Sequence, residues 1–130
     1  MDNSEKFVQG TIGWIDLTID DADKIKNFYS EVVGWQAEPV DMGGYNDFTM
    51  KTSNGEAITG VCNARGVNAN LPAQWLIYIN VVDIEKSIDR CIGLGGKVVA
   101  AIKVMGKQGR YCVIQDPAGA VVALFEPSQK

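Results

Sequence analysis

The chain contains no histidine, so its chemistry must come from carboxylates, tyrosines, lysines, cysteines or a bound cofactor. This excludes a histidine-based metal site, a Ser-His-Asp triad and a Cys-His pair. Asp16 is the most informative candidate, because alternation along Thr11–Thr18 places it on the same strand face as Trp14. A carboxylate among aromatic side chains is costly to desolvate unless it is paired. Asp16 therefore has an internal partner such as Arg110, a backbone amide or a water, or it awaits a cationic ligand, or it acts as a general base.

The element that presents Asp16 is the first of a series that we expect over the first half of the chain. A strand over Thr11–Thr18 leads to a helix that Asp20 or Asp21 caps and that Gly34 ends after Val33. Three strands separated by Gly-containing turns should follow: Gln36–Val40, Tyr45–Thr52 and Glu56–Cys62.

The second half repeats this order. The sequence predicts a strand, a helix capped by Asp83 that stops at Gly95-Gly96, and three more strands, with a basic loop after the first of these three: Gln74–Val82, Lys97–Ile102, loop Lys103–Gly109, Arg110–Gln115 and Ala120–Pro127. The capping motif Asp21-Ala-Asp-Lys matches Asp83-Ile-Glu-Lys, and Gly55 matches Gly119. We therefore predict an α+β fold of two tandem βαβββ modules, with a leader over 1–10, modules over 11–62 and 74–127, and a linker over 63–73.

Composition narrows the function classes. The chain has 130 residues, 46% of them hydrophobic, and these values predict one compact domain overall. Its formal net charge of −4 and lack of a basic patch argue against nucleic acid as a partner. No apolar run is long enough to span a membrane, and the N-terminus has no signal-peptide pattern. Three widely spaced cysteines are typical of free thiols in a reducing compartment, so we expect a cytoplasmic protein.

The ordered motifs resemble a known family. Trp14-Ile-Asp-Leu-Thr with Phe28-Tyr29 and Gly34-Trp35, then Trp75-Leu-Ile-Tyr-Ile-Asn-Val, and finally Asp116-Pro-Ala-Gly-Ala, are similar to the vicinal oxygen chelate superfamily, the glyoxalase, bleomycin-resistance and extradiol-dioxygenase group. The resemblance covers residues 11–127 and implies an open, barrel-like cup with the helices outside. It does not imply one activity, because this fold carries enzymes as well as drug-binding proteins.

Metal enzymes of the family place His, Gln or Glu at four positions in the cup. By resemblance these positions fall on Trp14 and Thr59 in the first module and on Leu76 and Ala123 in the second. None supplies a strong metal ligand, and Glu126 lies on the opposite strand face from Ala123. We therefore predict no metal, no other cofactor and no catalytic residue.

The alternation rule gives the predicted lining of the cup, an apolar and aromatic surface with a few polar groups. The predicted ligand-binding residues are Trp14, Asp16, Phe48, Met50, Thr59, Leu76, Tyr78, Asn80, Ala123 and Phe125. We predict a homodimer that binds an apolar or cationic aromatic compound without a metal, as in drug sequestration and antibiotic resistance.

Three alternatives stay open at this point. The first is a lyase- or isomerase-type enzyme that uses Asp16 with Tyr78 or Thr59 for acid–base work. The second is a metal-dependent, glyoxalase-like enzyme, which would require that the ligand positions have been placed in the wrong register. The third is an interaction module whose cup is filled by its own Trp14 and Phe125 side chains.

Overall fold

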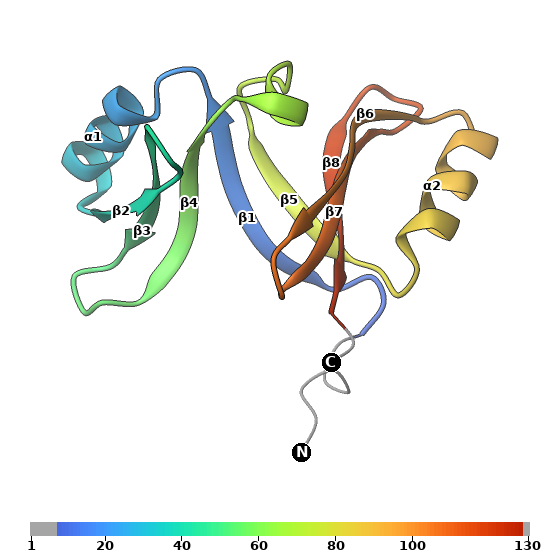
Figure 1. The fold of residues 1–130 in the computed structure, drawn as a ribbon, viewed down its shortest axis with the longest axis horizontal. Helices are drawn as coiled ribbons and strands as arrows, with labels where there is room; N and C mark the ends of the chain where they lie inside the picture. Colours follow the sequence, from blue (N-terminus) through green and yellow to red (C-terminus); the bar gives the residue numbers. More distant parts are fainter. Residues whose placement is uncertain (1–7, 129–130) are drawn as a thin grey trace. The chain divides into compact units, whose positions relative to one another are not determined.

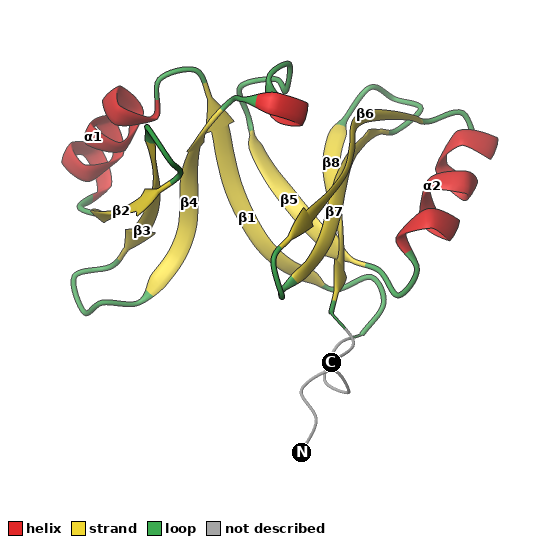
Figure 2. Ribbon diagram, viewed as in Figure 1, coloured by secondary structure: helices red, strands yellow, loops and turns green. Residues whose placement is uncertain are grey.

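A computed structural model describes residues 8–128, and these form two compact units. The first unit comprises 15–75; the second joins 8–14 to 76–128. Most of the predicted leader, residues 1–7, lies outside the described residues. The α+β prediction with two βαβββ modules is confirmed, and Figures 1 and 2 show each helix beside the strands of its own unit. Among the described residues, none of the helices has the length and apolar character needed to cross a membrane.

The first unit has the strand order β2-β3-β4-β1, with helix α1 against β3 and β4. Its elements are β1 (Ile12–Ile19), α1 (Ala22–Val33), β2 (Gln36–Asp41), β3 (Asn46–Lys51), β4 (Ala57–Asn63) and the short 3-10 helix η2 (Gly66–Asn68). Asp21 caps α1, since its carboxylate accepts a hydrogen bond from the Lys24 backbone N–H at 3.1 Å. Gly34 ends the helix with a φ of 81°, which a residue with a side chain rarely adopts.

The core of the first unit lies between α1 and its strands. Ala22, Phe48, Met50 and Val61 are buried there, and partly buried hydrophobic side chains complete the cluster: Ile19, Ile25, Tyr29, Trp35, Ala37 and Trp75. The Trp75 indole N–H donates to the Tyr29 hydroxyl at 3.2 Å, so Trp35 and Trp75 are packing residues of this core.

The second unit has the strand order β5-β8-β7-β6, with α2 against β6, β7 and β8. Its elements are β5 (Trp75–Asn80), α2 (Ile84–Gly93), β6 (Lys97–Met105), β7 (Gly109–Gln115) and β8 (Val121–Pro127). Asp83 caps α2 through the Lys86 backbone N–H, again at 3.1 Å. Val81, Ile84, Cys112 and Leu124 form the buried core beneath α2.

Two details of the second unit differ from expectation. The predicted loop Lys103–Gly109 is mostly strand, because β6 continues to Met105 and pairs Lys103 with Tyr111. The chain before β1 is also tied down: the Gly10 N–H donates to the Asn80 carbonyl at 2.8 Å. The Gln9 side chain accepts from the Val82 N–H at 2.7 Å. Residues 8–10 of the predicted leader thus join the second unit through β5.

Candidate functional site

The sheet face of the second unit that points away from α2 carries most of the predicted site. Strands β5 and β8 pair in parallel, with Tyr78 opposite Ala123 and Asn80 opposite Phe125. Their strand neighbours Ile79 and Leu124 pack into the α2 core instead. Since side chains alternate along a strand, Leu76, Tyr78, Asn80, Ala123 and Phe125 share this face, and their role in ligand binding stays a prediction.

This face is aromatic and well packed. The Tyr78 and Tyr111 rings lie 5.7 Å apart between centroids, and Tyr111 stands opposite Phe125 on the neighbouring strand. Leu76, Tyr78 and Ala123 are buried, Phe125 is partly exposed, and Trp14 at the edge of the unit is 39% exposed. The sequence analysis missed Tyr111. Because Tyr111 precedes the core residue Cys112 on β7, strand alternation could have placed it on the face away from α2.

A polar group interrupts this apolar face at the end of β5. The Asn80 amide donates to the Thr11 hydroxyl at 3.1 Å, which orients the side chain. Gly13 lies directly against it: a Cβ added there would be 2.8 Å from Asn80 Nδ2. The Asn80 amide can approach the backbone this closely because Gly13 has no side chain. Asn80 is the only amide among the predicted site residues, and its position is fixed by this contact and by Thr11.

In the first unit, by contrast, part of the predicted lining is wrong. Phe48 and Met50 belong to the core against α1, where Met50 is fully buried. Thr59 pairs with Met50 and therefore shares its face; its side chain is 2% exposed and donates to the Ile15 carbonyl at 2.6 Å. These three residues face α1 and have a packing role, so they are removed from the candidate site.

A β-bulge explains the error at Thr59. Lys51 pairs with Ala57, but the preceding residue Met50 pairs with Thr59, so Ile58 is an extra residue in β4. One extra residue moves every later side chain of the strand to the opposite face. The residue of the first unit that corresponds to Ala123 is therefore Gly60, which stands opposite Asp16 as Ala123 stands opposite Tyr78.

Asp16 lies on the face of the first unit opposite the α1 core. A Cβ added at Gly60 would meet the Asp16 Cβ at 3.5 Å and the Cys62 sulfur at 3.6 Å, so these groups share one face. The side chain is half-buried, and its Oδ1 atom is shielded from solvent. Arg110, the predicted internal cation for Asp16, is engaged elsewhere, because its guanidinium donates to Glu85 at 2.7 Å and Glu126 at 2.9 Å.

With the corrected register, the four family ligand positions fall on Trp14, Gly60, Leu76 and Ala123, and none has a side chain that binds a metal. One acidic cluster among the described residues, Asp83, Glu85 and Glu126, could group around an ion. However, Arg110 bridges Glu85 and Glu126, and Glu126 also accepts the Ile84 N–H at 3.0 Å.

Arg110 therefore neutralises part of the charge of this cluster, and Asp83 accepts the Lys86 backbone N–H. The hydrogen bond from Arg110 lowers the pKa of Glu85, which keeps this carboxylate charged and paired. The cluster fixes the start of α2 to β7 and β8, which is a structural role.

Comparison with known proteins finds a matching family and several similar proteins. The sequence model of the Glyoxalase/Bleomycin resistance protein/Dioxygenase superfamily matches residues 11–124. CFP32 of Mycobacterium tuberculosis, which carries a provisional glyoxylase name, is 33% identical over 99% of this chain and 50% of its own length. The anthracycline biosynthesis protein DnrV of Streptomyces peucetius is 28% identical over 92% of this chain and 48% of its own length. The chain thus spans about half the length of these curated relatives.

Solved structures agree on the fold. Methylmalonyl-CoA epimerase from Mycobacterium tuberculosis matches with a TM-score of 0.52 and 17% identity, covering 92% of this chain and 88% of that one. A Streptomyces coelicolor methylmalonyl-CoA epimerase variant matches with a TM-score of 0.55 and 16% identity, covering 92% and 99%. The family match over most of the chain and the two βαβββ modules lead to one conclusion: the chain belongs to the Glyoxalase/Bleomycin resistance protein/Dioxygenase superfamily.

Proposed function

We propose that this protein binds a small apolar or cationic aromatic molecule and that binding needs no metal ion. The observation that carries the proposal is the aromatic face of the second unit, where Tyr78, Tyr111 and Phe125 surround small and apolar side chains and Asn80 offers one oriented amide. Apolar surfaces with a few placed polar groups are typical of small-molecule sites.

The residue types at the four family ligand positions support the same proposal. A tryptophan, a glycine, a leucine and an alanine cannot form the donor set with which a Lewis acid is held. Asp16, in the first unit, is proposed separately as an anchor for a cationic ligand.

The relatives' names guide the choice of ligand. A protein named for anthracycline biosynthesis matches over most of this chain, and the family name includes bleomycin resistance. An anthracycline combines a planar polycycle with an amino sugar, and the polycycle is the part that the aromatic face would bind. We extend the proposal to a cytoplasmic homodimer that sequesters such a compound.

Titration with the fluorescent anthracycline daunorubicin, together with melting curves, tests the proposal. A ligand at about 100 times its Kd adds about 2.7 kcal/mol to the free energy of unfolding. Asp16→Asn should weaken binding and leave the fold intact, whereas Asp20→Asn, a matched change at an exposed carboxylate, should not weaken it. Equal affinity in both variants would overturn the anchoring role of Asp16.

Melting curves are also recorded with Ni²⁺, Zn²⁺, Mn²⁺ and Fe²⁺. No increase in the melting temperature is expected from these ions, and metal-dependent stabilisation or turnover would overturn the metal-independent proposal. Acid–base catalysis by Thr59 is already disfavoured because its hydroxyl is buried and bonded to a backbone carbonyl. An enzyme of this fold would have to use Asp16 or Tyr78.

A further inference from the structure

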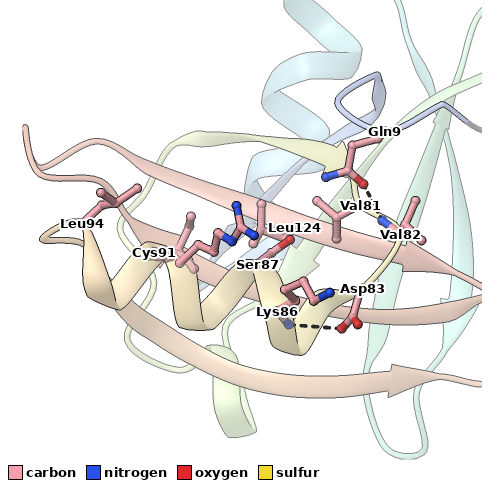
Figure 3. Close-up of a pocket in the computed structure, with 11 residues that line it drawn as sticks. Gln9, Val81, Val82, Asp83, Lys86, Ser87, Cys91, Leu94 and Leu124 are labelled. Carbon is pink, nitrogen blue, oxygen red and sulfur yellow. Dashed lines mark hydrogen bonds between the residues drawn. The ribbon is translucent and has the colours of Figure 1, made fainter.

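A hollow lies within the second unit, on the side of its sheet that faces α2 (Figure 3). It has a volume of about 560 Å³ and is lined by α2, by Val81 and Val82 after the end of β5, by Ile114 of β7 and Leu124 of β8, and by Gln9 before β1. Leu124 follows Ala123 on β8 and points to the opposite face. The hollow is therefore separate from the proposed aromatic site.

The floor of this hollow is apolar. Val81 and Leu124 belong to the core beneath α2, and Ile114 packs against that core. At the far end of the helix, Leu94 is 78% exposed although it lines the hollow. Val81 and Leu124 are buried, so the apolar surface that a hydrocarbon chain would newly cover belongs mainly to Leu94 and to Val82, which is 56% exposed. Covering such surface is the main source of affinity for apolar ligands.

The rim is cationic. Lys86 and Arg90 are one turn apart on α2 and line the hollow together with Ser87 and Cys91. Among the described residues, neither cation forms an ion pair with a carboxylate, while Arg110 and Lys51 do. Asp83, the acidic residue of the lining, uses its carboxylate to accept the Lys86 backbone N–H (Figure 3). Two cations thus face one carboxylate in a chain of net charge −4.

We propose that this hollow binds an alkyl carboxylate, with its anionic head at Lys86 and Arg90 and its chain along Val81, Leu124 and Leu94. Arginine and lysine bind carboxylates through charge-assisted hydrogen bonds. From Lys86 to Leu94 the helix rises about 12 Å, which suits a medium-chain acid better than a short one. The size of the hollow is in the usual range for small-ligand sites.

Calorimetric titration of the full chain with decanoate tests the proposal. Decanoate should bind, while acetate, which lacks the chain, and decanol, which lacks the charge, should each bind about tenfold more weakly or not at all. The double variant Lys86→Gln/Arg90→Gln should lose about tenfold or more in affinity for decanoate. Lys24→Gln is the matched control, because Lys24 follows its cap Asp21 on α1 as Lys86 follows Asp83 on α2.

A second readout locates the ligand. Cys91 lines the hollow and is partly exposed, so decanoate should slow its alkylation by iodoacetamide, while Cys62 of the first unit should react at an unchanged rate. Unaltered affinity in the double variant, equal binding of decanol, or equal protection of both thiols would overturn the proposal. Because daunorubicin is assigned to the opposite face, decanoate should not displace it, so either proposal can fail without the other.

Discussion

The two units have the same element order, yet their sheets assign equivalent residues to different faces. In the second unit β7 and β8 pair without interruption from Gln115–Val121 to Cys112–Leu124, and alternation from Gly119 places Ala123 correctly. In the first unit, the bulge at Ile58 interrupts the alternation of side chains along β4, so the equivalent rule places Thr59 on the wrong face. Caps and turn glycines thus fix which elements form, while the number of residues between paired positions fixes which face each side chain occupies.

The largest difference between the units should appear when their glycines are replaced. Gly109→Ala places a Cβ 2.2 Å from the Glu126 carbonyl at a φ of 149°, so we expect a loss of about 3 kcal/mol or more in unfolding free energy. Gly60→Ala meets only ordinary contacts of 3.5–3.6 Å and should change stability by less than about 1 kcal/mol. Urea denaturation measures both, and a tolerated Gly109→Ala would contradict the described pairing of β7 with β8.

The assignment of Met50 to the core predicts the next largest effect. Met50→Ala should lower the unfolding free energy by about 2–5 kcal/mol, because the side chain is fully buried against α1. Thr49→Ala, one residue away on the opposite face, should cost far less. Urea denaturation followed by circular dichroism makes the comparison. Equal stability of the two variants would indicate that the corrected register is wrong.

A smaller change in stability is expected when the ion pairs of the two units are removed, and it should differ between the units. Arg110 lowers the pKa of Glu85 below its ordinary value of 4.5, so the stabilisation by this pair is present above pH 4.5 and is lost as the pH falls through the lowered pKa. Arg110→Gln should therefore reduce the melting temperature at pH 7 and have a diminishing effect below pH 4.5.

Lys51→Gln, which removes the single pair with Glu38 in the first unit, is the control. An exposed single pair contributes little, so its effect at pH 7 should be smaller than that of Arg110→Gln. A melting-temperature difference for Arg110→Gln that does not shrink at low pH would show that the charge network is not its cause.

The last prediction concerns the alkylation of the two thiols near α2, Cys91 and Cys112. Burial, with a further contribution from Cys91, raises the pKa of the Cys112 thiol to about 11, so little thiolate exists at pH 8. Mass spectrometry after brief alkylation of the native protein at this pH should find Cys91 modified and Cys112 intact. Prompt modification of Cys112 would contradict its burial.

Much of this architecture could be predicted from local signals. Asp21 and Asp83 cap their helices, and Gly34 ends α1, because backbone N–H groups and a left-handed residue have strict side-chain preferences. The bulge could not be predicted, since Ile58 has no composition or turn signal and its position depends on pairing with β3. The partners of Arg110 come from α2 and β8, which only the tertiary structure brings together. The α2 hollow was missed although Lys86 and Arg90 have helical spacing.

The most direct test of the central claim compares one phenylalanine from each unit. We expect Phe125→Leu, on the aromatic face, to raise the Kd for daunorubicin about two- to tenfold with little loss of stability. Phe48→Leu, in the α1 core, should lower the unfolding free energy by about 1–3 kcal/mol and leave the Kd unchanged. The opposite pattern, or a wild-type protein that does not bind daunorubicin, would contradict the assignment of the ligand to the second unit's aromatic face.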